Sequence, residues 1–265
     1  MAKPIMAKPI ANPKSIDLNA DSGESFGPWR LGDDETLFDY LTSANLACGF
    51  HAGDPSHMNQ SIKLAKAKGV AVGAHPGFPD KVGFGRRDMT LSYDELYCDT
   101  IYQIGALKAF LSLYDMPLHH VKPHGALHHR MVKDRETCEA VIAAIHDVVP
   151  DIPLVALAGP GGLLMQETAQ RLKLPFVLEA FPERGYLADG RLCPRDRAGA
   201  SIHDPELAAE RALAMSEGYI MSLEGEKIPL KVDTLCIHGD NPHAIEIAKA
   251  IYKTLKQAGI ALASF

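Results

Sequence analysis

A histidine and an aspartate stand together in two loops that directly follow apolar runs. The two loops contain His51 with Asp54, and His238 with Asp240. An imidazole beside a carboxylate can move protons or bind a metal ion. The alternative is structural, because an aspartate followed by proline is a typical helix start and a histidine can simply occupy a turn. Helix capping needs no histidine and the arrangement occurs twice, so we favour a functional interpretation.

Four further groups of polar residues follow apolar runs. They are Asn19, Asp21 and Glu24; His75; Lys122 with His124; and Glu179 with Arg184. Carboxylates at a strand end can act as a general base or bind a metal, although Asx turns are an alternative. A lysine directly after a buried strand would be desolvated, which lowers its pKa, unless it pairs with a carboxylate across the site.

These side chains together suit the hydrolysis of an amide-like bond. A carboxylate or histidine would activate water, a cation would stabilise the developing oxyanion, and a histidine would protonate the leaving nitrogen. Motifs of dinucleotide-binding proteins, serine hydrolases and zincins are absent from the sequence. We therefore expect catalytic roles for Asp21, His51, Lys122, His124, His238 and Asp240. We expect substrate contacts from Asn19, Glu24, Asp54, His75, Glu179 and Arg184, and a divalent metal could bind Asp21, His51 and His75.

Predicted strands alternate with predicted helices along the chain. The strands are expected at 15–20, from 44, and at 70–74, 118–121, 153–158, 175–179 and 232–237. The helices are expected at 33–41, 55–68, from 92, and at 134–149, 163–172, 205–217 and from 241. Such alternation implies a parallel sheet with right-handed crossovers. Because polar clusters follow six strands rather than one switch point, we favour a barrel over an open doubly wound sheet.

Composition limits the class of protein further. The chain has 265 residues, and its net charge of −6 argues against a nucleic-acid or anionic-membrane surface. No apolar run is long enough to cross a membrane, and no signal peptide is evident. Five cysteines without a C-x-x-C pair indicate free thiols and a reducing, cytoplasmic location. Residues 1–14 repeat Met-Ala-Lys-Pro-Ile and are expected to form a tail, with one domain at 15–265.

The clusters, in this order, resemble those of the LamB/YcsF family, whose members are described as the A component of 5-oxoprolinase. The matching stretches are 17–24, 44–55, 73–76, 121–127, 179–181 with Arg184 and Tyr186, and 236–240. The resemblance implies an irregular seven-stranded β/α barrel similar to that of polysaccharide deacetylases. It also implies ATP-dependent opening of 5-oxoproline to L-glutamate, together with partner subunits B and C. The chain departs from the family at Ala20, often Cys, and at His128, often Tyr.

Other functions stay open at this point. One is a stand-alone metal-dependent deacetylase or amidohydrolase, and another is a binding subunit without catalysis. The chain has no evident ATP site, because 159–162 is glycine-rich but lacks the G-K-[ST] of a phosphate-binding loop. We therefore expect the partner subunits to phosphorylate the lactam oxygen with ATP, and this chain to hydrolyse the activated species.

Overall fold

The computed structural model describes residues 15–265. The segment 1–14, for which the sequence predicted a tail, lies outside the described residues. None of the helices within 15–265 is both long enough and apolar enough to cross a membrane.

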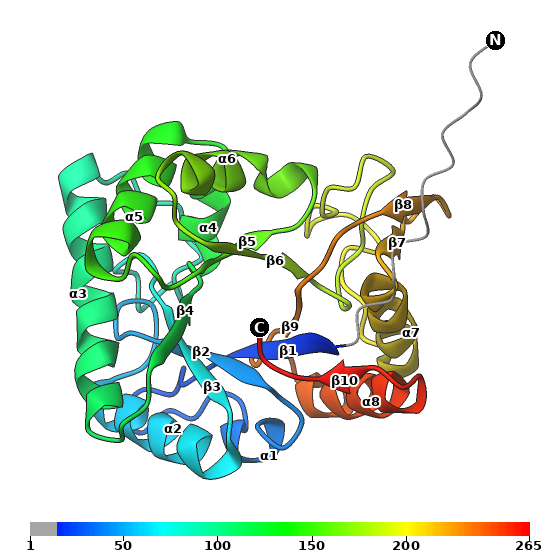
Figure 1. The fold of residues 1–265 in the computed structure, drawn as a ribbon, viewed down its shortest axis with the longest axis horizontal. Coiled ribbons are helices and arrows are strands. Elements are labelled where there is room, and N and C mark those ends of the chain that lie inside the picture. The colour runs from blue at the N-terminus through cyan, green and yellow to red at the C-terminus, as the bar shows by residue number, and fades with distance from the viewer. Residues whose placement is uncertain (1–14) are drawn as a thin grey trace.

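Seven parallel strands form a closed barrel (Figure 1). They are β1 (Ser15–Ser22), β2 (Ser43–Ala47), β3 (Ala71–His75), β4 (Leu118–Val121), β5 (Leu154–Leu157), β6 (Phe176–Ala180) and β9 (Thr234–Ile237). The strands follow one another around the barrel, and β9 closes it by pairing with both β6 and β1. The predicted barrel is therefore confirmed, and its strands lie within two residues of the expected bounds.

Helices surround the barrel on the outside (Figure 1). They are α1 (Asp34–Leu37), α2 (Pro55–Lys68), α3 (Tyr93–Ser112), α4 (Gly125–Met131), α5 (Arg135–Val148), α6 (Leu163–Arg171), α7 (Pro205–Ser216) and α8 (Ala244–Gln257), with a 3-10 turn, η1 (Pro160–Gly162), before α6. Capping fixes several of their first residues. Asp54 accepts bonds from the first turn of α2, and Ser92 forms a capping box with Glu95 at the start of α3.

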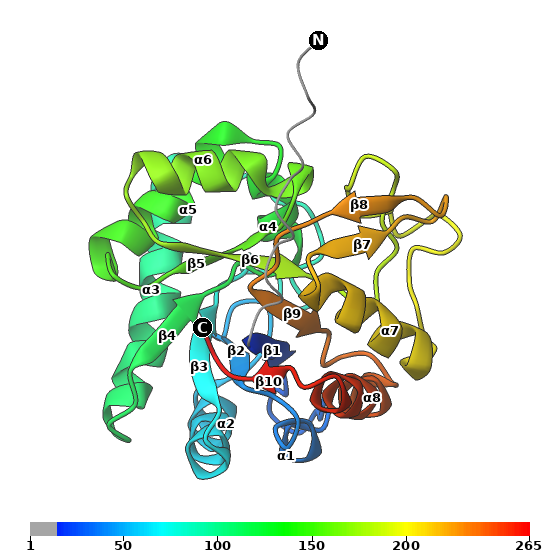
Figure 2. The same cartoon turned by 45° about the vertical axis from the view of Figure 1, so that its right-hand side comes forward.

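Some elements differ from the sequence predictions. Helix α1 ends at Leu37 rather than residue 41, and α8 begins at Ala244 rather than at the Asn-Pro pair before it. Helix α4 begins at Gly125, whereas the sequence placed a helix start near His128 and His129. A hairpin of β7 (Tyr219–Met221) and β8 (Lys227–Pro229), and β10 (Ala261–Leu262), were not predicted. Figure 2 shows the hairpin beside α7, off the barrel. Strand β10 adds to β1 near its start.

Candidate active site

The interior of the barrel is polar along β1. Asp17, Asn19 and Asp21 alternate with Leu18 and Ala20, and all five are buried. Because successive side chains of a strand point to opposite faces, one face of β1 packs against the apolar core while the other lines the barrel interior. The three polar residues therefore form a column from the base of the barrel to its carboxyl end. We call Asp17, Asn19 and Asp21 the polar column.

Hydrogen bonds across the barrel satisfy the polar column. Asp17 accepts bonds from three hydroxyl groups, those of Thr42, Ser43 and Thr234. One layer higher, the Asn45 amide donates to Asn19 at 2.7 Å and to Asp21 at 2.9 Å. Buried polar groups that are fully hydrogen-bonded in this way hold one another in a single arrangement. The column thus fixes the position of Asp21 at the top of the barrel.

The oxygen of Asn45 accepts a bond of 2.6 Å from Nε2 of His120 on β4. Burial lowers the pKa of His120 well below its usual value, so the ring is neutral. His120 fits beside β3 only because Gly73 has no side chain: a Cβ there would lie 2.1 Å from Nε2. The register of β3 against β4 shifts at this glycine.

Lys122 follows β4 and places its ammonium at the top of the polar column. Its Nζ lies 3.0 Å from Asp21 and 2.8 Å from Glu179, and it donates to the Cys236 sulfur at 2.9 Å. Burial alone would lower the pKa of this lysine, but the surrounding negative groups raise it well above its usual value. The expectation of a lowered pKa was therefore wrong, and the alternative, pairing across the site, is what the structure shows. A buried point charge of this kind can stabilise an oxyanion.

His75 and His124 face each other at the ends of β3 and β4. Nδ1 of His75 donates to the Lys122 carbonyl at 2.6 Å, and Nε2 of His124 donates to the Phe84 carbonyl at 2.8 Å. The ring hydrogens are therefore on Nδ1 of His75 and Nε2 of His124. The other two nitrogens, Nε2 of His75 and Nδ1 of His124, are 2.9 Å apart and both present lone pairs. Two lone pairs at this distance repel each other unless a proton or a cation lies between or beside them.

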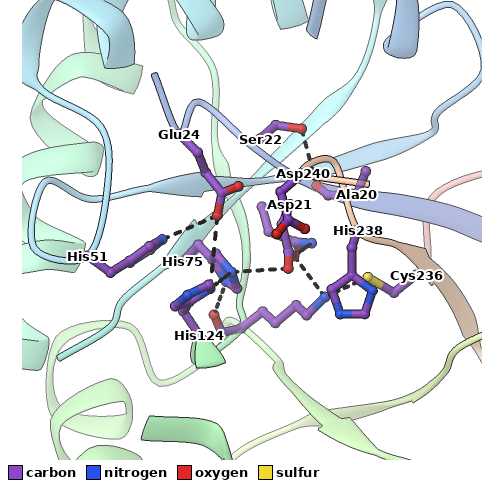
Figure 3. Close-up of polar contacts among 12 residues, drawn as sticks. Ala20, Asp21, Ser22, Glu24, His51, His75, His124, Cys236, His238 and Asp240 are labelled. Atoms are coloured by element: carbon purple, nitrogen blue, oxygen red, sulfur yellow. Dashed lines mark hydrogen bonds and ion pairs between the residues drawn. The ribbon is translucent and has the colours of Figure 1, made fainter. Parts of the chain in front are cut away.

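Two more buried groups adjoin these lone pairs and lack hydrogen-bond partners among the described residues. They are Oε1 of Glu24 and both ring nitrogens of His51. Nε2 of His51 is 3.4 Å from that oxygen, and the His51 ring stacks on His124 with centroids 3.8 Å apart. Burial, with Asp21 nearby, raises the pKa of Glu24 well above its usual value. Figure 3 shows the side chains of Glu24, His51, His75 and His124 pointing toward one another.

Glu24, His51, His75 and His124 each offer one ligand atom, and the four atoms lie within 4.8 Å of one another. Three imidazoles with one carboxylate fit a first-row metal such as Zn²⁺ better than Mg²⁺, which prefers oxygen ligands. Backbone carbonyls orient two of the imidazoles, as is usual for metal-binding histidines. The residues present therefore fit a divalent metal, although the set differs from the predicted Asp21, His51 and His75: Glu24 and His124 take the place of Asp21.

His238 follows β9 on the opposite side of Lys122 from this cluster. Nδ1 of His238 donates to Glu183, whose other oxygen accepts a 2.9 Å bond from Asn241. Burial would raise the pKa of Glu183, but the bonds from His238 and Asn241 lower it, so Glu183 is a carboxylate. This fixes the tautomer of His238 and leaves Nε2 free to accept a proton. Its ring stacks on Phe181 with centroids 5.3 Å apart.

A cavity of about 230 Å³ opens above these groups. Among the residues that line it are Asp21, His75, Lys122, His124, Glu179, Arg184 and His238. The structure thus brings seven of the twelve predicted site residues into one cavity at the carboxyl ends of the strands. Asn19 lies one layer below in the polar column, and His51 and Glu24 lie behind His124.

The remaining two predicted residues do not line this cavity. Asp54 caps α2 and accepts bonds from the backbone of Ser56, His57 and Gly27. These contacts are those of a helix cap, the alternative to a substrate contact. Asp240 forms an ion pair with Arg86 at 2.5 Å and lines a smaller hollow that adjoins the site cavity at His238 and Arg184.

Sequence reasoning missed several residues that position the site. Glu183, which orients His238, directly precedes Arg184 in a polar loop, and both residues are buried. Its position next to a predicted site residue was the one signal in the sequence that could have identified it. Asn45, His120 and Cys236 lie within predicted strands, where a lone polar residue is hard to distinguish from a satisfied core residue. Their roles depend on which face of the barrel they occupy.

A closed β/α barrel with buried acid–base groups at the carboxyl ends of its strands has the architecture of a barrel enzyme. The sequence assigns the family: residues 16–265 match the model of the LamB/YcsF family, and the chain belongs to it. The A component of 5-oxoprolinase from a strain of Thermus thermophilus is 53% identical over 251 residues, 94% of this chain and 99% of that protein. Its counterpart from Deinococcus radiodurans is 52% identical, covering 94% and 96%.

Solved structures agree with this assignment. The crystal structure of the Lactam Utilization Protein from Thermus thermophilus covers 95% of this chain and 100% of its own, with a TM-score of 0.91 and 52% identity. A protein from Enterococcus faecalis has a TM-score of 0.54 at 12% identity, which shows the shared fold alone.

Proposed function

We propose that this chain is the ring-opening subunit of an ATP-dependent 5-oxoprolinase, which converts 5-oxoproline to L-glutamate with partner subunits B and C. The names of its relatives support the lactam substrate and the existence of other subunits. The observation that carries the proposal is the buried ammonium of Lys122, in one cavity with an imidazole whose proton-accepting nitrogen is free. Opening of an activated cyclic amide needs both groups, a cation for the negative charge that develops in the ring and a base for water.

His238 is the base in this proposal. Its Nε2 takes a proton from water, while Glu183 holds the ring in the required tautomer and stabilises the imidazolium that forms. The water oxygen bonds to the carbon of the activated lactam, the electron pair of the carbon–nitrogen double bond moves to the ring nitrogen, and Lys122 stabilises the negative charge that develops there. The carbon–nitrogen bond of the ring then breaks, and the imidazolium returns its proton to the leaving nitrogen. Asp21 and Glu179 keep Lys122 charged and in place.

Activation by ATP precedes this step. We infer that the partner subunits transfer a phosphoryl group from ATP to the lactam oxygen, giving ADP and an imidate phosphate. Addition of one water and cleavage of the carbon–nitrogen bond then give the γ-phosphate anhydride of glutamate. A second water releases phosphate and L-glutamate. One ATP and two waters are therefore used for each ring that opens, and the ring nitrogen becomes the free amine.

A divalent metal is a further part of the proposal. Glu24, His51, His75 and His124 would hold it, and it would supply positive charge beside Asp21 and the cavity. The orphaned atoms of Glu24 and His51 support this assignment. The five free cysteines of the chain support a cytoplasmic location.

Omission of subunits tests the proposal. The three subunits are mixed with 5-oxoproline and ATP, each is left out in turn, and glutamate and ADP are measured. We expect glutamate only from the full set, and little ATP hydrolysis by this chain alone. Glutamate release that persists without this chain would show a binding role. Amide hydrolysis by this chain alone, dependent on metal but not on ATP, would show a stand-alone amidohydrolase.

A further inference from the structure

A second hollow adjoins the site cavity and is strongly basic. It has a volume of about 560 Å³ and shares Arg86, Ala126, His128, His129, Arg184, Leu192 and Arg195 with the lining of the site cavity. Arg130, Lys133 and Arg191 also line it, and Asp88 is the one carboxylate residue in its lining. We call this hollow the basic annex. The chain as a whole carries a charge of −6, so the annex has the opposite sign to the molecule.

Arg184 lies at the junction of the annex and the site cavity. The residue is 5% exposed, and its guanidinium donates to the carbonyls of Ala200 at 3.0 Å and Cys193 at 2.7 Å. No carboxylate among the described residues lies within ion-pair distance of it. A buried cation without an anionic partner is costly, so a bound anion beside Arg184 would be stabilised by it.

Arg195 and Lys133 add exposed positive charge that no carboxylate of the described chain neutralises. Arg86, Arg130 and Arg191 differ, because they pair with Asp240, Asp88 and Asp189 respectively. The free positive charge of the annex is therefore concentrated on Arg184, Arg195 and Lys133. Guanidinium groups suit phosphate because their planar donors match its oxygens.

The combined size of the two hollows fits a ring-shaped substrate that carries a second group, such as a phosphoryl group. The site cavity, at about 230 Å³, is smaller than the roughly 300–1,000 Å³ of typical ligand pockets. The annex brings the combined space into that range.

We propose that the basic annex binds the phosphoryl group of a phosphorylated lactam while the ring occupies the site cavity. The inference deepens the proposed function and rests on it. Arg184 and Arg195 hold the phosphate oxygens, and Lys133 adds positive charge at the rim. The phosphoryl group thereby orients the lactam carbon toward Lys122 and His238.

Phosphate binding by the isolated full chain tests the inference without turnover. Inorganic phosphate is titrated into wild type, Arg195→Gln and Arg197→Gln, and heat is measured. Both substitutions remove one positive charge from the same exposed loop, but Arg197 lines neither hollow. We expect Arg195→Gln to weaken phosphate binding roughly tenfold or more, since it removes a charge-assisted hydrogen bond, and Arg197→Gln to leave binding unchanged. Equal effects of the two, or no phosphate binding by wild type, would overturn the inference.

Two further titrations separate the sources of the anion. 5-Oxoproline carries a carboxylate but no phosphate, and we expect phosphate affinity to be unchanged in its presence. Competition between the two, with both weakened by Arg195→Gln, would assign the annex to the substrate carboxylate and overturn the inference. ATP binding that is tighter than phosphate binding and lost in Arg195→Gln would assign the annex to a nucleotide and would also overturn the inference. If phosphate binds as expected but the full complex releases no glutamate, the proposed function fails while the phosphate site stands.

Discussion

Replacing Lys122 by methionine separates its structural role from its proposed catalytic one. Methionine keeps the unbranched chain as far as Cε and removes the charged nitrogen, so Asp21 and Glu179 lose their shared ammonium. These carboxylates are buried, and nothing else of positive charge bonds to Glu179 among the described residues. The substitution therefore affects both the stability of the barrel and the chemistry in the cavity.

The structure sets the magnitude of the stability loss. At an effective dielectric constant of about 20, each contact near 3 Å contributes roughly 5 kcal/mol of Coulomb energy. The several kcal/mol needed to desolvate the ammonium offset much of this sum, and removing one partner of a buried pair typically costs about 3–5 kcal/mol. We expect a loss of this size in the free energy of unfolding. Turnover of the complex per folded molecule should fall about a hundredfold or more.

The assay measures urea unfolding and ATP-dependent glutamate release on the same preparation. Lys122→Met with Glu179→Gln should regain part of the lost stability, because one unpaired charge is removed, but none of the activity. Lys231→Met is the matched control: its ammonium is exposed and 3.6 Å from Asp233, so the change should cost less than about 1 kcal/mol. If Lys122→Met is destabilised but turns over at nearly the wild-type rate per folded molecule, Lys122 has no part in catalysis.

Three other predictions concern Gly73, Glu183 and Glu24, which surround the cavity or support its lining. Gly73→Ala should lower the free energy of unfolding by about 1–3 kcal/mol in urea titrations, because the new Cβ displaces His120; an unchanged midpoint would contradict the packing described. Glu183→Gln should cost about 1–3 kcal/mol at neutral pH. Since the pKa of Glu183 is lowered by folding, its contribution is present above about pH 4.5 and is lost on acidification, so the two unfolding curves should converge as pH falls; a constant difference would refute this. Zn²⁺ should bind the chelator-treated chain more tightly as pH rises, because burial raises the pKa of Glu24 and its proton must leave; calorimetry should show a weaker trend in Glu24→Gln, and an unchanged trend would contradict this role of Glu24.

The order of strands and helices could be predicted from the sequence because each strand ends where an apolar run meets polar residues. The same pattern predicted that His75, Lys122, His124 and His238 would meet, since parallel strands end at one face of a barrel. Hairpin β7–β8 escaped prediction because its strands have three residues each and lie off the barrel. Such short strands carry almost no periodicity.

The state of each site residue could not be predicted, because it depends on partners from distant strands. Lys122 has a raised pKa only because β1 and β6 bring two carboxylates to it, and neither is near it in sequence. Asp54 shows the opposite case: the local signal of a helix cap predicted its contacts in α2, and its one distant hydrogen bond among those described, from the Gly27 backbone, leaves it outside the cavity. The candidate metal ligands differ from prediction for the same reason: Lys122 pairs with Asp21, whereas one oxygen of Glu24 has no hydrogen-bond partner among the described residues.

The closure of the barrel by β9 has a consequence for synthesis of the protein on the ribosome. Asp17 and Thr234 are partners 217 residues apart, so at about 5–20 residues per second roughly ten to forty seconds separate their translation. During that interval β1 has one unpaired edge, and Asp17 lacks one of its hydroxyl donors. Before β9 is made, a sheet of the first six strands has two edges that β9 would cover, those of β1 and β6, and such edges invite pairing with other chains. The cavity acquires His238 only when β9 and its loop have left the ribosome, so nascent chains and products truncated before β9 lack the proposed base even if the first six strands assemble.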